Sequence, residues 1–452
     1  MKNLFKYAAV QWKSMLAIIV ILFVQAYCDL SLPAYTSDIV NVGIQQGGIE
    51  DQIPEAISVE EMDRLLLFVP EDDQQTVLDA YDKDDSTYDT EAYVLKSSVS
   101  DNEDEIGELE DLLQGPMMLV SGFESGSDMT KQIESQIKEN LPPQMVSEDM
   151  DIFDIMEMLP QEQRDAMTEK MSEQLKDMPD SILEQAAVSY VRSAYENVGM
   201  DMDRMQTNYL LVTGGKMAAL AFLGMAASVT VGFLASRVGA STGRNLRSRV
   251  FKKVVGFSNN EFDHFSTASL ITRSTNDIQQ IQLLTVMLLR IVLYAPILAI
   301  GGIWQVFQTN VSMSWIIALA VVLIALVILV LFLVAMPKFK ILQTLVDKVN
   351  LVMREILTGL PVIRAFSTEK HEEERFDAAN LDLTKTNLFV NRAMTFMMPV
   401  MMLVMNGVSV LIMWTGAHGI DDGQMQVGDM MAFIQYTMQI IMGFLMLCML
   451  SI

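Results

Sequence analysis

Two apolar segments near the end of the chain, 388–416 and 429–452, carry the side chains best suited to bind a small molecule. Methionine and aromatic side chains are frequent in both. Methionine is flexible and polarizable, so such a set adapts to varied apolar shapes. The pattern indicates a permissive cavity for amphipathic compounds, and it equally suits helix packing or lipid contact. The candidate cavity residues are Phe396, Met397, Met401, Met405, Phe433, Tyr436 and Met442.

Polar side chains inside the apolar segments are more informative, because an ionisable group is costly within a bilayer. Arg290 lies about seven residues into the segment 283–307, and we predict a functional or interhelical charge there. Asn406 is suited to hydrogen-bond a neighbouring helix or a substrate. Lys216 is a further candidate, and Arg392 fits a side chain that snorkels to the membrane surface. No catalytic residue and no metal site is predicted.

The composition places these segments in a membrane protein. The 452 residues are 51% hydrophobic and include 36 methionines. Runs long enough to cross about 30 Å of hydrocarbon recur six times. We therefore expect an all-α membrane protein with six spanning helices, at about 15–36, 208–236, 283–307, 314–336, 388–416 and 429–452.

The negative charge is concentrated in one region. Residues 45–207 contain 41 acidic and 10 basic side chains, whereas the rest of the chain is mildly basic. A Ser58–Glu61 capping box and a stripe of Met167, Met171, Leu175 and Met178 predict a mostly helical module with its own core. Few apolar residues fall between about 82 and 105, so we expect no regular structure there. The module is thus an acidic insertion of about 160 residues between the first two spans.

Lys and Arg residues predict the orientation. They gather in the N-terminal tail and in the loops 237–282 and 337–387, whereas the short connections near 308–313 and 417–428 have none. The N-terminus and both long loops are therefore expected in the cytoplasm of a multi-pass plasma-membrane protein. The acidic module is expected to be extracytoplasmic, because long loops are translocated regardless of charge.

The two long loops resemble helical hairpins of similar size. Each has about 45–50 residues between spans, and in the second a helix is expected to stop at Gly359 and restart beyond Pro361. Nucleic-acid binding is a poor explanation, because the basic residues lie close to the membrane and acidic residues accompany them. We interpret the hairpins as two prongs of one docking surface, with a plain connecting role as the alternative.

These loops also carry a family resemblance. Arg249-Val-Phe-Lys-Lys-Val, Glu261-Phe-Asp-His-Phe and Thr275-Asn-Asp-Ile resemble the first intracellular loop of multidrug-type ABC exporters. Arg354-Glu-Ile-Leu-Thr-Gly and Val362-Ile-Arg-Ala-Phe are similar to the second. The resemblance implies a domain-swapped dimer whose loop tips contact nucleotide-binding domains. The implied coupling residues are Ser258, Asn259, Asn260, Glu261, Phe262, Asp263 and Phe265, then Ile363, Arg364, Ala365, Phe366, Ser367 and Thr368.

The chain departs from that family in two respects. No G-x-x-x-x-G-K-[ST] loop is present, and no nucleotide-binding domain follows Ile452, so we expect a fragment of a longer subunit or an ATPase on another chain. ATP and Mg²⁺ are then implied on that missing or partner domain, and this chain binds no cofactor. The large insertion resembles that of one subunit in some heterodimeric bacterial exporters, which implies a second, different half-transporter as partner.

Two hypotheses of different class follow. The first is the membrane-spanning part of an ATP-driven exporter of amphipathic or drug-like compounds, made of residues 1–44, the insertion 45–207 and spans two to six in 208–452. The second is a membrane-anchored sensor or adhesion protein whose 45–207 module is the active part. Paired hairpins favour the first, because an anchor has no need for them.

Overall fold

The computed structural model is predominantly helical and forms two compact units. It describes residues 11–84, 88, 90–100, 102–126, 130–131, 152–160, 163–164, 166–168, 170–171, 178–258, 265, 267–309 and 313–451. We call Met1–Ser31, Ala221–Thr415 and Phe433–Ile452 the membrane unit. We call Leu32–Leu220 and Gly416–Ala432 the acidic unit.

Among the described residues, five stretches of helix are long and apolar enough to cross a bilayer. The sixth predicted span is covered by helix α18 (Val427–Ser451), which is not one of these five. The multi-pass, all-α membrane architecture expected from the sequence is therefore confirmed. The five stretches are Trp12–Gln45, Met202–Val255, Thr267–Gln308, Ser314–Ala365 and Glu369–Asp421.

The elements that form these stretches differ in regularity. Helices α11 (Met202–Val255), α16 and α17 each run unbroken for more than 50 residues, or roughly 80 Å at 1.5 Å per residue. The first and third stretches change instead between α and π geometry. Their elements are α2 (Trp12–Asp38) and η2 (Ile39–Gln45), then α13 (Thr267–Thr272), η3 (Arg273–Asp277), α14 (Ile278–Met287), η4 (Leu288–Val292) and α15 (Tyr294–Thr309).

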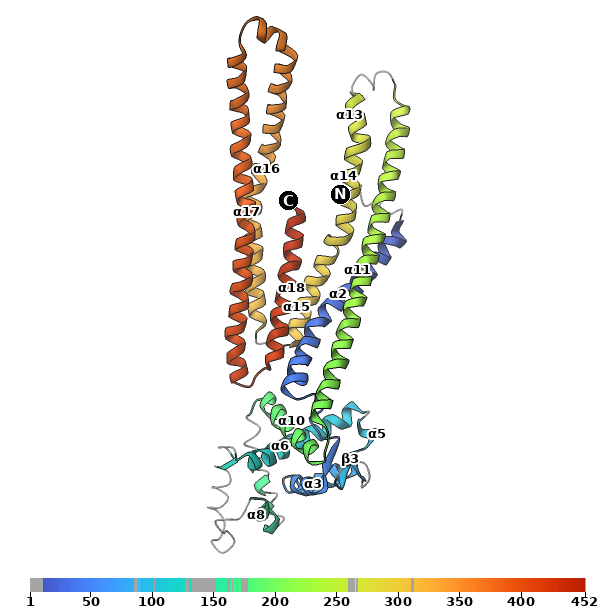
Figure 1. Ribbon diagram of the computed structural model, residues 1–452, viewed down its shortest axis with the longest axis vertical. Helices are drawn as coiled ribbons and strands as arrows, with labels where there is room; N and C mark the ends of the chain where they lie inside the picture. The colour runs from blue at the N-terminus through green and yellow to red at the C-terminus, as the bar shows by residue number, and fades with distance from the viewer. Residues whose placement is uncertain are drawn as a thin grey trace. The chain divides into compact units, whose positions relative to one another are not determined.

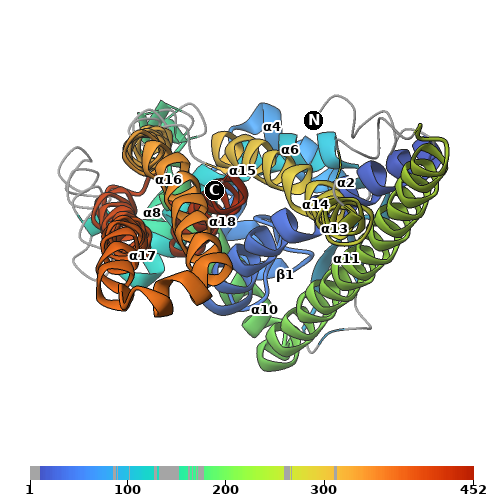
Figure 2. The same ribbon diagram turned by 90° about the horizontal axis from the view of Figure 1, so that it is seen from above.

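Helices α16 (Ser314–Ala365) and α17 (Glu369–Asp421) form one long hairpin, drawn in orange in Figures 1 and 2. The expected stop at Gly359 is wrong, because α16 continues through Gly359 and Pro361 to Ala365. A proline inside a helix removes one backbone hydrogen bond. Ile356 and Leu360 before the proline and Ile363 after it line one groove together with Phe376 of α17, so the same face of the helix continues past Pro361.

Close helix packing in the membrane unit depends on small residues. A Cβ at Gly239 of α11 would lie 2.7 Å from Val286 of α14, and one at Gly243 would lie 2.8 Å from Gln282. The absence of a side chain at these two glycines lets α14 approach α11 closely. We call α11 with α13 to α14 the first hairpin and α16 with α17 the second hairpin of this unit. Apolar residues of α2, including Ile18 and Leu22, pack with Val231 and Leu289 beside the first hairpin.

The acidic unit has a core of its own around a small antiparallel sheet. Strand β3 (Ala92–Leu95) lies between β1 (Ala56–Ser58) and β2 (Tyr81–Asp84), with Ala56 opposite Val94 and Tyr81 opposite Leu95. The expectation of no regular structure between 82 and 105 is therefore wrong, because cross-strand pairing stabilises this polar stretch. The helices are α3 (Val59–Leu66), α4 (Glu71–Ala80), α5 (Ser97–Ser100), α6 (Glu103–Ser125), α8 (Ile152–Met158) and α10 (Asp180–Asn197).

The core of the acidic unit combines α6, α10 and the predicted methionine stripe. Met171 is buried there, and Met167 and Met178 pack against the same core, while Leu175 lies outside the described residues. The predicted cap at Ser58 is confirmed, since its hydroxyl accepts a hydrogen bond from the backbone amide of Glu61 at 3.2 Å. The module is thus mostly helical, as its sequence predicts.

Candidate functional site

The tip of the first hairpin is held by stacked rings. The rings of Phe257 and Phe265 stack with centroids 5.9 Å apart, and the Arg273 guanidinium lies 5.3 Å from the centre of the Phe265 ring. These contacts join the end of α11 to η3, so the two arms of the hairpin meet at its tip. Ser258 and Phe265 flank the tip, whereas Asn259, Asn260, Glu261, Phe262 and Asp263 lie outside the described residues.

The tip of the second hairpin is a tight helix end. The backbone amide of Thr368 donates to the Ile363 carbonyl at 3.1 Å, and that of Ser367 donates to the Arg364 carbonyl at 3.4 Å. These two bonds form a Schellman motif, which normally places glycine in the left-handed position. Here Ser367 occupies it, with φ of 47°. The predicted coupling residues from Ile363 to Thr368, including Arg364 and Ala365, thus form one compact turn.

Apolar side chains project from this second tip. Phe366 is 76% exposed, and Val362, one turn earlier, is 60% exposed. An exposed aromatic ring beside an exposed aliphatic chain is a feature of surfaces that meet a partner protein. The tip therefore offers an apolar contact outside the chain's own core.

A groove of about 470 Å³ runs beside this tip between α16 and α17. Apolar side chains line it together with the carboxylates of Glu369, Glu373 and Asp377. Arg375 pairs with Glu355 and with Glu372, and the Glu355 carboxylate raises the pKa of Arg375 above its ordinary value. The other lining residues are Met353, Ile356, Leu360, Ile363, Glu372 and Phe376.

The predicted cavity residues fall into two groups. Met397 and Met401 are buried with Ile324 and Ile441 between α16, α17 and α18, and Met405 packs beside them. Phe433 and Tyr436 are also buried, at 0% and 2% exposure. Within a single chain these side chains are packed core. The second group is exposed and consists of Arg290, Phe396, Asn406 and Met442.

Arg290 lies in the π-helical segment η4 and is exposed. Single π turns inside α-helices are frequent at functional sites. Arg290 thus combines π-helical geometry with an exposed side chain in the single chain. Lys216, the other cation considered in a span, is exposed as well.

The sequence analysis missed a polar cluster that contains a carboxylate in the first span. Asp29 of α2 accepts a short hydrogen bond from the Tyr294 hydroxyl of α15. The side-chain amide of Gln439 on α18 donates to the Asp29 carbonyl at 2.9 Å. Asp29 is half-buried. A lone aspartate between two apolar runs is the sequence signal that indicates this cluster.

Comparison with known proteins supports the membrane assignment. Residues 181–444 match the family described as ABC transporter transmembrane region. The chain is similar to an uncharacterized ABC transporter ATP-binding protein of Mycobacterium tuberculosis, with 36% identity over 233 residues, which are 52% of this chain and 40% of the relative. An uncharacterized ABC transporter ATP-binding protein of Bacillus subtilis is 34% identical over 242 residues, 52% of this chain and 41% of the relative.

A more distant relative is the mitochondrial iron-sulfur clusters transporter atm1 of Neurospora crassa. It is 24% identical over 272 residues, which cover 56% of this chain and 36% of the relative. The chain spans about two fifths of the length of the curated relatives it matches.

Proposed function

This chain belongs to the ABC transporter transmembrane region family, and we propose that it is the membrane-spanning part of an ATP-driven exporter. It moves amphipathic or drug-like compounds out of the cell by alternating access. ATP and Mg²⁺ bind to nucleotide-binding domains outside residues 1–452, and a second, different half-transporter completes the cavity. Two relatives are named as ABC transporter ATP-binding proteins, which supports this assignment.

The observation that carries the proposal is the exposed apolar tip of the second hairpin. Phe366 and Val362 project from a rigid turn at the end of two helices of more than 50 residues. A long, continuous helix transmits displacement along its axis with little bending. Closure of the nucleotide-binding domains on this tip therefore moves the spanning helices.

The distribution of basic residues supports an orientation with both hairpin tips in the cytoplasm. The described arms contain Arg244, Arg247, Lys338 and Lys340, whereas the short connections at the other ends of the spans have no Lys or Arg. In this orientation the acidic unit is extracytoplasmic, where its charge keeps it soluble and away from anionic lipid headgroups.

The exposed group of predicted cavity residues supports a two-chain cavity. Phe396, Asn406 and Met442 are accessible in the single chain and combine apolar surface with one hydrogen-bonding amide. A second half-transporter that packs beside the membrane unit turns these residues into a cavity wall.

The test is ATP-dependent accumulation of a fluorescent amphipathic dye in inside-out vesicles that contain the complete transporter. We expect uptake with ATP and none with a non-hydrolysable analogue. Phe366→Ala should lower uptake about tenfold or more while ATP hydrolysis continues, because the tip transmits motion and does not bind nucleotide. Phe233→Ala, at a phenylalanine on α11 that is 65% exposed, is the matched control. Uptake that is unchanged in Phe366→Ala contradicts the proposed coupling.

A further inference from the structure

A carboxylate lies near the middle of the first spanning helix. Asp29 is 17 residues beyond Trp12, or about 26 Å along a helix that rises 1.5 Å per residue. The stretch that contains it, Trp12–Gln45, is long enough to cross the bilayer. An ionisable group at such depth is costly and persists where it pairs with other groups or binds a ligand.

Polar groups from three helices converge on Asp29. The Tyr294 hydroxyl of α15 donates to Asp29 Oδ2, and the Gln25 side chain, one turn earlier on α2, hydrogen-bonds the same hydroxyl. Gln439 of α18 reaches the Asp29 carbonyl. We call Gln25, Asp29, Tyr294 and Gln439 the Asp29 cluster. Among the described residues Asp29 has no ion pair, so its carboxylate has no protein cation as partner.

The Asp29 cluster has more acceptors than donors. Gln439 Oε1 is buried and has no hydrogen-bond donor among the described residues. The half-buried Asp29 accepts the Tyr294 hydroxyl at Oδ2, and its Oδ1 accepts no hydrogen bond from the described part of the chain. Gly224 of α11 faces this oxygen, since a Cβ there would lie 3.6 Å from Oδ1. A buried acceptor without a donor, such as Gln439 Oε1, is rare in folded proteins and calls for an explanation.

We propose that the Asp29 cluster binds the positively charged group of an organic cation. The proposal rests on the proposed export function and names the substrate class. A protonated amine or aromatic cation supplies both features that the cluster lacks, a positive charge and hydrogen-bond donors. The carboxylate pairs with the charge, the Gln439 amide oxygen accepts a donor, and the Tyr294 ring adds a cation–π contact. The apolar remainder of such a compound lies against the surrounding span residues.

The test is equilibrium binding to the complete transporter in lipid nanodiscs without ATP. Ethidium, a permanent aromatic cation, is compared with Nile red, an uncharged dye of similar size. Asp29→Asn keeps an acceptor for the Tyr294 hydroxyl but removes the charge. We expect it to raise the Kd for ethidium about tenfold, equivalent to about 1.4 kcal/mol, with the Kd for Nile red within about twofold of wild type. Asp29→Glu should retain ethidium binding within about threefold.

Asp347→Asn is the matched control, because it removes an exposed carboxylate on α16. Ethidium binding that is the same in Asp29→Asn and wild type overturns the inference. Equal weakening for both dyes also overturns it, because the residue then holds the fold and does not recognise charge. Since no ATP is used, these results are independent of transport. A wild-type protein that binds ethidium through Asp29 but accumulates no dye with ATP contradicts the export function alone.

Discussion

The side-chain oxygen of Asn41 accepts a hydrogen bond from the backbone amide of Gly428 at 2.7 Å, although 387 residues separate the two in sequence. The Asn41 amide in turn donates to Ser37 Oγ and to Asp429 Oδ1, each at 3.2 Å. Ser37 donates to the same Asp429 oxygen at 2.8 Å. These bonds tie the end of the first spanning stretch to the start of α18 within the acidic unit.

Asn41→Ala should lower the free energy of unfolding by about 1–3 kcal/mol. The reason is that the Gly428 amide and the Asp429 carboxylate lose a partner at a site where Asn41 is only 8% exposed. Thermal unfolding of the purified protein in detergent measures the effect. Asn208→Ala, at an exposed position on α11, is the control and should change little.

The close packing around Gly428 leads to a second prediction, which is steric. A Cβ at Gly428 would lie 2.5 Å from Asn41 Oδ1 and 2.6 Å from the Ser37 carbonyl oxygen. Gly428→Ala should therefore destabilise the protein by at least as much as Asn41→Ala. An alanine variant with the wild-type melting temperature would show that these elements are not packed as described.

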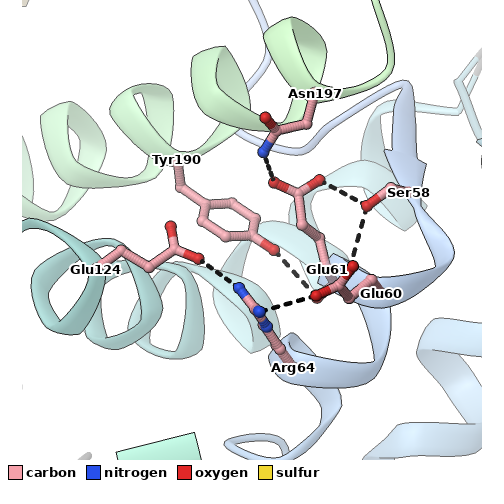
Figure 3. Close-up of polar contacts among 7 residues, drawn as sticks. All are labelled: Ser58, Glu60, Glu61, Arg64, Glu124, Tyr190 and Asn197. Atoms are coloured by element: carbon pink, nitrogen blue, oxygen red, sulfur yellow. Dashed lines mark hydrogen bonds and ion pairs between the residues drawn. The ribbon is translucent and has the colours of Figure 1, made fainter. Parts of the chain in front are cut away.

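Glu61 of the acidic unit should be far more important for stability than its neighbour Glu60. Glu61 is 5% exposed and accepts hydrogen bonds from Asn197 at 2.6 Å and Ser58 at 3.0 Å, as Figure 3 shows. Glu61→Ala removes a buried side chain together with both hydrogen bonds that it accepts, so we expect a loss of about 1–3 kcal/mol.

Glu60 provides the matched control. Its side chain is 78% exposed and pairs with Arg64, which also contacts Glu124 (Figure 3). Exposed ion pairs contribute little, so Glu60→Ala should change stability by less than about 0.5 kcal/mol. Hydrogen exchange of the α3 amides distinguishes the two variants, and equal effects would contradict the burial of Glu61.

The sequence predicted the fold well because its strongest signals are local. Apolar runs of spanning length, the cap at Ser58 and the methionine stripe each depend on residues close together in the chain. The predicted helix end at Gly359 and the predicted lack of regular structure in 82–105 were both wrong, because the local sequence does not determine the structure at these places. Helix α16 continues through Gly359 and Pro361 to Ala365, and the polar strand β2 is stabilised by its pairing with β3.

The candidate sites were harder to predict for the same reason. The sequence identified Met397 and Met401 as flexible, polarizable side chains. Their burial against Ile324 and Ile441 depends on how three helices pack together, which the sequence does not show. The Asp29 cluster joins residues that are more than 400 positions apart, from Gln25 to Gln439. A local sequence pattern cannot predict that residues so far apart come together, although a lone aspartate in an apolar run is a reason to look for polar partners.

Replacing Ser367 with glycine should increase the stability of the second hairpin tip. Its φ of 47° lies in the left-handed region, which costs a residue with a Cβ about 1 kcal/mol relative to glycine. Ser367→Gly should therefore raise stability at the second tip and slow exchange of the Thr368 amide, which donates to Ile363. Ser367→Val, with a β-branched chain in the same conformation, should have the opposite effect. Faster exchange in the glycine variant would show that the serine side chain itself holds the turn.

Glu110 on α6 makes the stability of the acidic unit depend on pH. Burial, followed by the nearby carboxylates of Asp51, Glu184 and Asp111, raises the pKa of Glu110 above its ordinary value of 4.5. The folded protein therefore binds a proton more readily than the unfolded chain, and stability falls as pH rises from 4.5 through the folded-state pKa. At neutral pH the charged Glu110 is destabilising, whereas below 4.5 it is protonated in both states and has no such effect.

Glu110→Gln should raise the melting temperature at pH 7, because the amide removes the charge yet still accepts the hydrogen bond from the Gln52 backbone. The gain should disappear near pH 4, where wild-type Glu110 is already neutral. The exposed neighbour Glu108 tests whether any lost charge on α6 has this effect, and Glu108→Gln should give a smaller gain. A Glu110→Gln gain of the same size at both pH values would mean that packing, and not titration, is responsible.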